Sequence, residues 1–401
     1  MIVVTGIGVV SPHGDDPGRM FEALLRGVSA VRAVFPELPK AAAAATVEFD
    51  ESRWFTRLQL AGVDRVSQLA LAAADLALKD AGDVRDGDPR RTGVYVGCGM
   101  GGGAALEGAY LSAARGGRVP PLTIPAFMPN APAAHVAMRF GLQGPVLTYS
   151  VACASSAVAI AEAAKAIRCG EVDLAIAGGS EALIVPGVIT AWQAMQTLAA
   201  FAPGEAARCC RPFAVDRSGF ALGEGAAFLI LESAERAARR GARCYAELAG
   251  WGLSCDATHL TKPDVGGQQR AIQAALDLAG LHPNEVGYCN AHGTATRIGD
   301  IVEAEALGAV WGEAIDRLRV SSTKSMHGHL LGATGALEAA ITVLALARRQ
   351  LPPNANCTEV EPQCRLNLVR EAGETAPGLA AAISSSFAFG GTNSVLAFRR
   401  T

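Results

Sequence analysis

Residues 145–179 read PVLTYSVACASSAVAIAEAAKAIRCGEVDLAIAGG and contain one strand–helix–strand unit. The β-branched residues of 145–153 and 172–179 predict two buried strands, and the alanine-rich stretch 154–170 between them has helical periodicity and ends at Gly170. Chains in which such runs alternate form α/β folds with buried sheets. This stretch therefore predicts an α/β protein.

The same order of elements occurs twice along the chain. VVTGIGVVSPHGD near residue 3 and ELAGWGLSCDATH near residue 247 are strand-like and contain GxG, and a helix-like and a strand-like stretch follow each of them. The segment around Cys153 then has a counterpart at 324–346, where a short turn again leads into a helix. Because no proline-rich or serine-rich linker interrupts the chain, we expect two duplicated α/β halves packed as one body. The predicted halves are residues 1–243 and 244–401.

Composition narrows the class of protein. The 401 residues are 50% hydrophobic and 18% charged, which suits a large buried core. With 35 basic and 38 acidic residues, the chain has no overall positive charge of the kind that nucleic acid or an anionic membrane attracts. The N-terminus lacks the pattern of a signal peptide, and Glu181 and Glu338 interrupt the longer apolar runs, so we expect a soluble, cytoplasmic protein.

Ten cysteines are scattered without metal-ligand or disulfide spacing, which indicates free thiols and no structural zinc site. Cys153 differs from the others because it lies where a predicted strand turns into a helix. A thiol at a helix N-terminus is stabilised as thiolate, and a sharp strand-to-helix turn exposes a nucleophile. The alternative is an ordinary buried core cysteine, since free cysteine is among the most buried residue types.

Polar groups gather in three glycine-containing segments of the second half. His292 lies in NAHGTAT, directly after a predicted strand, and His329 lies in STKSMHGHLLGATG, five residues after Lys324. The spacing of these residues alone does not show whether His327 or His329 is the functional histidine. The segment SSSFAFGGTN, 384–393, could bring backbone N–H groups close to a substrate, or it could be a buried strand that ends in a turn.

Four blocks in this order, VACASS, NAHGTAT, STKSMHGHLLGATGA and FAFGGTN, closely resemble the signature blocks of the β-ketoacyl-acyl-carrier-protein synthases I and II. GLQGPVLTYSVAC, RPFAVDRSGFALGEGAA and YAELAGWG fit as well, so the resemblance covers nearly the whole chain. It implies the thiolase fold, two duplicated halves in an α/β/α/β/α body, and a homodimer or a heterodimer with a related ketosynthase-like subunit. The implied partner is an acyl carrier protein, and no metal or other cofactor is implied.

The resemblance also assigns roles to the residues that match the family's blocks. Cys153 would take an acyl group from the carrier's phosphopantetheine, and His292 and His329 would assist decarboxylation of malonyl carrier protein and stabilise the enolate. His329 rather than His327 matches the histidine of the family's KSMTGH block. The remaining implied roles are positive charge from Lys324, an oxyanion hole from the N–H groups of Cys153 and Phe389, a gate at Phe389, pantetheine binding by Thr294 and Thr296, support from Glu338 and Asp300, and an acyl pocket near Met100, Leu106 and Phe389.

Two other functions fit the same fold. A coenzyme A-dependent thiolase would lack the KSMxGH block beside the NAHGT histidine. A chain-length-factor-like partner would bind and measure a chain without condensing it, and the presence of Cys153, His292 and His329 argues against that role. The expected reaction is decarboxylative Claisen condensation in fatty acid or polyketide and polyene synthesis. The stretch GVDRVSQLA lacks the basic residues that the family usually has there for carrier docking.

Overall fold

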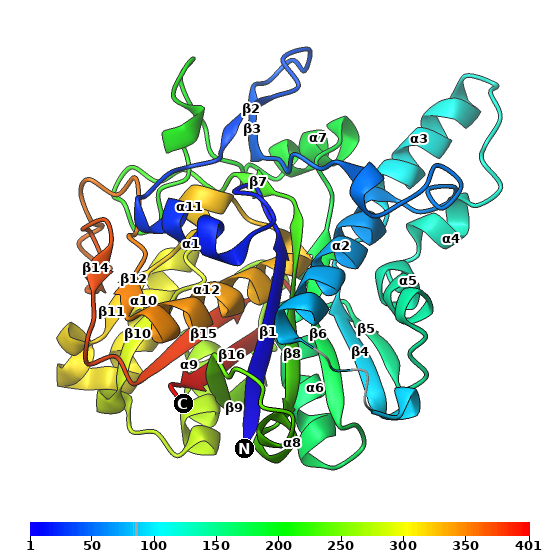
Figure 1. Ribbon diagram of the computed structural model, residues 1–401. Coiled ribbons are helices and arrows are strands. Elements are labelled where there is room, and N and C mark those ends of the chain that lie inside the picture. The colour runs from blue at the N-terminus through cyan, green and yellow to red at the C-terminus, as the bar shows by residue number, and fades with distance from the viewer. Residues whose placement is uncertain (83, 85–86) are drawn as a thin grey trace.

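The computed structural model describes residues 1–82, 84 and 87–401, and its centre is a mixed β-sheet (Figure 1). In this part of the chain eleven strands are joined in the order β13-β11-β10-β15-β16-β9-β1-β8-β6-β4-β5. The strands of the first half are β1 (Ile2–Val10), β4 (Thr92–Gly97), β5 (Val146–Tyr149), β6 (Leu174–Glu181) and β8 (Gly225–Ser233). Those of the second half are β9 (Ala246–Cys255), β10 (Val286–Asn290), β11 (Arg319–Ser321), β13 (Asn367–Leu368), β15 (Ala381–Phe387) and β16 (Thr392–Arg399).

The two halves repeat one topology. Read outward from β1, the first half runs β8, β6, β4 and β5, with two antiparallel pairings followed by two parallel ones. Read outward from β9, the second half runs β16, β15, β10 and β11 with the same directions. The halves join where β1 pairs with β9, at Val3 with Glu247 and Val4 with Ala246. The duplication predicted from the sequence is therefore confirmed.

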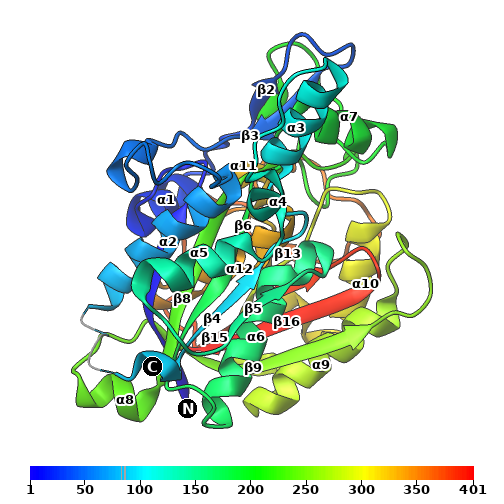
Figure 2. The ribbon, with the colours of Figure 1, turned by 90° about the vertical axis from the view of Figure 1, so that its right-hand side faces the viewer.

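Helices cover the two halves of the eleven-stranded sheet in layers. The long helices are α2 (Arg65–Ala81), α3 (Gly103–Ala114), α5 (Ala131–Phe140), α6 (Ser155–Arg168), α9 (Val265–Ala279), α10 (Gly299–Trp311) and α12 (Thr334–Arg348). Helix α2 packs on β1, β6 and β8, whereas α9 packs on β9 and β16 with α10 beside it. Helices α6 and α12 lie between the two halves of this sheet and touch strands of both halves (Figure 2). This is the α/β/α/β/α arrangement of the thiolase fold.

The GxG of each half allows its outer helix to approach the sheet. A Cβ atom on Gly8 of β1 would overlap the carbonyl oxygen of Ala73 in α2. In the second half, a Cβ on Gly252 of β9 would overlap the carbonyl oxygen of Ala271 in α9. Glycine is therefore required at equivalent places because helix backbone lies directly against strand backbone.

Helix α12 is buried on all sides. Every residue from Thr334 to Leu346 is buried. Within the described residues one helical stretch, Leu331–Arg348, is long and apolar enough to cross a membrane, and it meets that criterion although it contains Glu338, contrary to the expectation from the sequence. Since 89% of this stretch is buried inside the fold, its apolar composition is that of a core helix.

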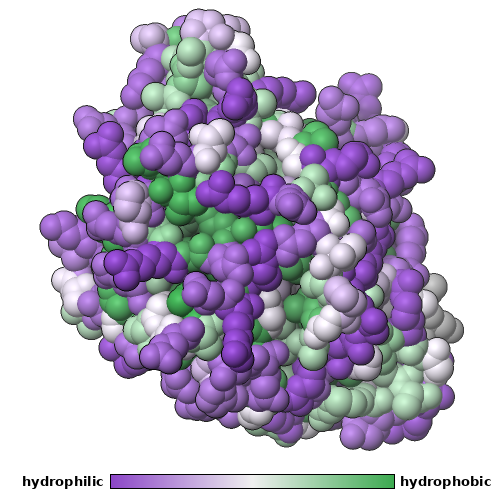
Figure 3. All heavy atoms as spheres, turned by 90° about the vertical axis from the view of Figure 1, so that its left-hand side faces the viewer, coloured by the Kyte–Doolittle hydropathy of each residue, from purple (hydrophilic) through white to green (hydrophobic). Residues whose placement is uncertain are grey.

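Smaller elements complete the molecule. A small sheet is formed by β2 (Arg32–Val34), β3 (Ala42–Ala45) and β7 (Leu222–Gly223), and β12 (Gln350–Leu351) pairs with β14 (Glu374–Thr375). The short helices are α1 (Pro17–Leu25), α4 (Thr123–Phe127), α7 (Pro186–Ala194), α8 (Ala234–Arg239) and α11 (Lys324–His327). The face in Figure 3 is mostly hydrophilic, with one apolar area below the projecting top of the molecule. All ten cysteines are free, as the sequence predicts.

Candidate active site

Cys153 lies in a tight turn between β5 and α6. The strand predicted to reach Cys153 ends at Tyr149, because Ala152 has a φ of 49° and reverses the chain. The Ser155 hydroxyl fixes this turn by accepting from the Val151 N–H (2.9 Å) and donating to the Ala152 carbonyl (2.7 Å). A left-handed alanine is strained, and such strain is characteristic of functional turns. The turn holds the Cys153 sulfur at the floor of a cavity.

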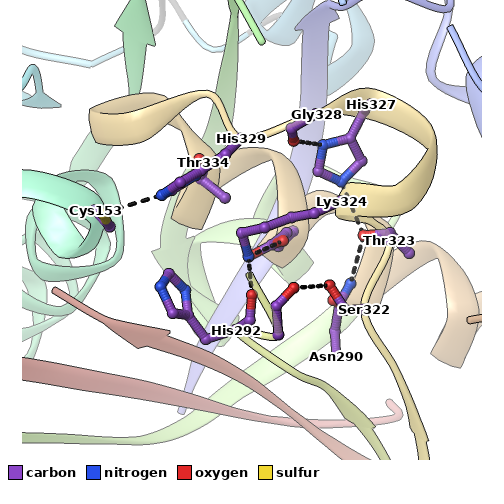
Figure 4. Close-up of polar contacts among 12 residues, drawn as sticks. Cys153, Asn290, His292, Ser322, Thr323, Lys324, His327, Gly328, His329 and Thr334 are labelled. Atoms are coloured by element: carbon purple, nitrogen blue, oxygen red, sulfur yellow. Dashed lines mark hydrogen bonds and ion pairs between the residues drawn. The ribbon is translucent and has the colours of Figure 1, made fainter. Parts of the chain in front are cut away.

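His329 reaches the same sulfur from the second half of the chain (Figure 4). Its Nε2 lies 3.0 Å from Cys153 Sγ, and its Nδ1 lies 2.9 Å from Thr334 Oγ1. The backbone of His329 is held against β7, since its N–H donates to Ala221 (2.7 Å) and its carbonyl accepts from Gly223 (2.8 Å). With Nδ1–H donating to the threonine hydroxyl, Nε2 is free to accept the thiol proton.

His292 faces His329 from the end of β10, with 5.6 Å between the ring centroids. The N–H groups of His292 and Gly293 each donate to Glu303 of α10 at 2.7 Å, which fixes the backbone of this loop. Nδ1 of His292 has no hydrogen-bond partner among the described residues. One nitrogen of each histidine and the sulfur of Cys153 lie within 4.8 Å of one another, so the three groups can act on one substrate atom.

These three donor atoms are also a set that could hold a metal ion. Sulfur and imidazole nitrogen are ligands that zinc accepts. The sequence predicts no metal here, and the buried ammonium of Lys324 opposes binding of a second cation close by.

Lys324 and Glu338 form a buried ion pair behind the histidines. Both side chains are fully buried, and Nζ lies 2.6 Å from Glu338 Oε1 while it also donates to the His292 carbonyl. Burial raises the pKa of Glu338 to about 7, and the charge of Lys324 opposes that rise. The pair therefore holds the ammonium group of Lys324 beside the cavity, where it is hydrogen-bonded to the backbone carbonyl of His292.

The electrostatics correct one expectation from the sequence. Burial raises the pKa of the Cys153 thiol to about 11, although Lys324 and the N–H groups of Phe389 and Cys153 itself lower it. The prediction that helix placement makes Cys153 a thiolate is therefore wrong for the substrate-free cavity. Burial, followed by the charge of Lys324, holds the pKa of His292 and His329 well below the usual range. Both rings are neutral at neutral pH, so His329 can serve as a base.

His327 has a different environment. Its Nε2 lies 2.9 Å from Thr323 Oγ1 and its Nδ1 lies 2.7 Å from the Gly328 carbonyl oxygen, so both nitrogens are engaged. In Figure 4 its ring lies on the opposite side of Lys324 from Cys153. The structure brings His329, and not His327, to the cysteine.

The cavity above Cys153 has a volume of about 570 Å³. Thr294 and Thr296 line it and share a hydrogen bond of 3.0 Å between their hydroxyls. Phe389 lines it from the β15–β16 turn, where Gly390 and Gly391 have φ values of 89° and 78° that favour glycine. The backbone N–H of Phe389 donates to the Cys153 sulfur, so this predicted oxyanion-hole donor lies beside the predicted nucleophile.

Three further predicted residues lie outside this cavity. Met100 and Leu106 are not among the residues that line it; Met100 is exposed just before α3, and Leu106 is half-buried within α3. Asp300 is buried below the cavity, where it accepts from the Phe213 N–H (2.7 Å) and lies 3.6 Å from Arg217. The acyl pocket expected near Met100 and Leu106 is therefore not part of the cavity above Cys153, and it stays a prediction.

Several site residues were missed by sequence reasoning because their partners are distant in the chain. Glu303 fixes the His292 loop and Thr334 orients His329. Trp192 of α7 stacks on Phe389 at 6.2 Å. Buried Glu181 accepts from the N–H groups of residues 99 (2.8 Å) and 332 (3.0 Å), which ties the two halves together beside the site. Thr334 lies in the block GATGA, but the sequence of that block does not predict its hydrogen bond with His329.

An alkylation experiment tests the role of His329 as a base. In His329→Ala, we expect alkylation of Cys153 by iodoacetamide at pH 7 to slow by at least about tenfold, because a buried thiol of raised pKa loses its proton acceptor. The rate should then rise as the pH approaches 11. Peptide mapping measures it, and the exposed Cys169 and Cys255 provide an internal control. An unchanged rate at Cys153 would show that His329 does not activate it.

Comparisons with known proteins agree with this site. The model of the β-ketoacyl synthase N-terminal domain matches residues 1–237, and that of the β-ketoacyl synthase C-terminal domain matches residues 245–358. Nodulation protein E of Rhizobium meliloti is 41% identical over 404 residues, which cover 100% of this chain and 99% of that protein. The 3-oxoacyl-[acyl-carrier-protein] synthase 2 of Staphylococcus aureus (strain N315) is 38% identical over 408 residues, with coverage of 100% and 98%.

Solved structures show the same fold. The ishigamide ketosynthase/chain length factor matches with a TM-score of 0.92 and 32% identity over 100% of this chain and 99% of that one. A type II polyketide ketosynthase, solved in complex with its acyl-carrier protein, matches with a TM-score of 0.91 and 31% identity over the same shares. Family models and relatives thus cover both halves, including every block around Cys153, His292 and His329. The chain belongs to the β-ketoacyl synthase family, a family of acyltransferases.

Proposed function

We propose that the chain itself catalyses decarboxylative Claisen condensation between an acyl group on Cys153 and malonyl carrier protein, in the cytoplasm, for fatty acid or polyketide chain elongation. The observation that carries the proposal is the 3.0 Å approach of His329 Nε2 to Cys153 Sγ, with His292 converging on the same point. A chain that only measured a product would not need a base against a buried thiol.

The first half-reaction is acyl transfer to Cys153. His329 Nε2 takes the thiol proton as the sulfur attacks the carbonyl carbon of the acyl carrier thioester. The developing oxyanion accepts hydrogen bonds from the N–H groups of Cys153 and Phe389, which already point at the sulfur. The bond from the carbonyl carbon to the carrier's sulfur then breaks, and the carrier leaves as a thiol after it receives the proton from His329.

The second half-reaction uses both imidazoles as donors. Loss of carbon dioxide from the malonyl thioester transfers the electrons of the broken carbon–carbon bond to an enolate. The Thr334 hydroxyl can either accept from Nδ1–H of His329 or donate to Nδ1, so Nε2 can also carry the proton and face the enolate oxygen. The enolate carbon attacks the acyl thioester on Cys153, whose sulfur leaves as thiolate. Thr294 and Thr296 would hold the pantetheine arm.

A partner subunit is part of the proposal. One solved relative is a ketosynthase with a chain length factor, and another was solved with an acyl-carrier protein. We propose a homodimer or a heterodimer with a related ketosynthase-like subunit, which acts on carrier-bound substrates. Such a subunit would lie against the acyl pocket expected near Met100 and Leu106, which do not line the Cys153 cavity.

The test of the reaction is carbon dioxide release from malonyl carrier protein together with the mass of the carrier-bound product. Several acyl primers should be supplied, with a chelator present. The expected product is β-ketoacyl carrier protein. Condensation of acetyl coenzyme A in the absence of any reaction with malonyl carrier protein would instead indicate a thiolase.

The two histidines should separate the half-reactions. His292→Ala should keep acylation of Cys153 but lower condensation at least about 100-fold, since it removes an enolate donor. His329→Ala should lower condensation similarly and also slow acylation, because Nε2 of His329 lies 3.0 Å from the sulfur and takes its proton. Intact-protein mass spectrometry measures acylation, and His327→Ala is the matched control. Normal condensation by either active-site variant would remove that histidine from the mechanism.

A further inference from the structure

The turn that carries the nucleophile has a counterpart in the second half of the chain. Cys153 is the middle residue of the short helix η3 (Ala152–Ala154), which begins with a φ of 49° and leads directly into α6. In the second half, the short helix η7 (Leu331–Ala333) begins with a φ of 47° and leads directly into α12. The backbone N–H of Gly332 therefore corresponds to that of Cys153 in the duplicated turn.

The N–H groups at the start of α12 donate to side chains of the first half. The Gly332 N–H donates to Oε2 of Glu181 (3.0 Å), and the Ala336 N–H donates to Oγ of Ser156 (2.8 Å). Such N–H groups have no partner within their own helix, and α12 has no capping side chain of its own. Glu181 ends β6 and Ser156 lies in the first turn of α6, so the two halves are joined at this helix start.

The carboxylate of Glu181 is fully buried among backbone N–H groups. Besides Gly332, Oε2 accepts from the Gly99 N–H (2.8 Å), and Oε1 accepts from the Met100 N–H (3.3 Å). A Cβ atom on Gly332 would overlap both the Gly99 nitrogen and Oε2, so glycine is required for this close approach. The positive end of the α12 dipole also favours a carboxylate here.

This anchor lies between the two residues that hold the base in place (Figure 4). His329 precedes Gly332 by three residues, and Thr334, whose hydroxyl lies 2.9 Å from His329 Nδ1, follows it by two. On the other side of the contact, Ser156 follows Cys153 by three residues. A shift of η7 would therefore change the 3.0 Å distance between His329 Nε2 and Cys153 Sγ. Proton transfer requires that these atoms stay within hydrogen-bond reach.

We propose that Glu181 and Ser156 are positioning residues that hold His329 at the Cys153 thiol. This inference rests on the proposed function, because it assumes that proton transfer between His329 and Cys153 is a step of the reaction. Each positioning residue acts through a backbone N–H group of the second half and not through the reacting atoms. Since the nucleophile and its base come from different halves, these two hydrogen bonds join the turns that carry them.

The test measures the rate of Cys153 alkylation by iodoacetamide at pH 7 and the kinetics of condensation. Glu181→Gln and Ser156→Ala should each slow alkylation and lower kcat about tenfold, while KM for malonyl carrier protein stays within about twofold. The amide of Glu181→Gln keeps the shape but replaces one acceptor oxygen with a donor. Ser180→Ala is the matched control, because this buried neighbour of Glu181 donates to the Val66 carbonyl of α2 (2.6 Å). It should leave alkylation and condensation within about twofold.

A double-mutant cycle separates positioning from a general loss of structure. In the His329→Ala background, Glu181→Gln and Ser156→Ala should not slow alkylation of Cys153 further, because the base that they position is absent. The same further slowing in that background would overturn the proposal, as would unchanged rates in both single variants. If Glu181→Gln does not fold, Ser156→Ala alone decides the question. Absence of condensation by the unmodified enzyme would refute the proposed function, whereas the alkylation cycle would still test the positioning of His329.

Discussion

Replacing Cys153 with alanine is expected to abolish acylation of the enzyme and to lower condensation by at least about 10³-fold, because it removes the sulfur that lies 3.0 Å from His329 Nε2 and forms the thioester. Slow carbon dioxide release from malonyl carrier protein should persist, since His292 and His329 remain able to stabilise the enolate. Intact-protein mass spectrometry and the mass of the carrier-bound product measure the two effects separately.

The matched control is Cys364→Ala, which removes a buried sulfur in the second half, outside the cavity. It should stay within about threefold of the unmodified enzyme in condensation, at a modest cost in stability. If Cys153→Ala, assembled with a ketosynthase-like partner, condensed as fast as the unmodified complex, this chain would be the silent, chain-measuring subunit.

Glu338→Ala should produce the largest loss of stability among site variants. It leaves the ammonium of Lys324 fully buried without its carboxylate, and breaking a buried ion pair from one side costs about 3–5 kcal/mol of unfolding free energy. Urea denaturation measures this as a lower midpoint with an unchanged slope. An unchanged midpoint would show that the pair contributes nothing to the fold.

A double variant separates stability from catalysis at this pair. Lys324→Met with Glu338→Leu removes both charges and fills the space with apolar atoms, so most of the lost stability should return. Condensation should remain low, because the positive charge and the donor to the His292 carbonyl are both absent. Recovery of activity together with stability would assign Lys324 a purely structural role.

Much of the fold could be predicted because its signals are local and repeated. The alternation of strands and helices, the paired GxG stretches and the glycines at helix ends each depend on neighbouring residues. The helix predicted over residues 154–170, for example, is α6 (Ser155–Arg168), and Gly170 follows its end with a φ of 71°. The four motif blocks similarly contained Cys153, His292, Lys324 and His329, which the structure brings together.

What could not be predicted depends on burial and on long-range contacts. Burial of the sulfur is the main reason that the pKa of Cys153 is raised. The sequence around Cys153 does not show how deeply the sulfur is buried. Glu303 supports His292 only because α10 folds back beneath the loop. Met100 does not line the cavity and is 49% exposed, a position that depends on how residues 98–103 fold and not on a local sequence pattern.

The central layer also constrains the order in which the polypeptide can fold. Helix α12 is buried on every side because it packs on β8 of the first half as well as on β15 of the second. Helix α6 of the first half likewise packs on β16 of the second. A nascent chain released only as far as residue 243 would therefore expose α6 to solvent until the remaining residues were synthesised. Such a species is prone to aggregation, so late docking of the second half is the step at which a chaperone would act. Destabilised variants such as Glu338→Ala should then show low soluble yield before they show altered kinetics.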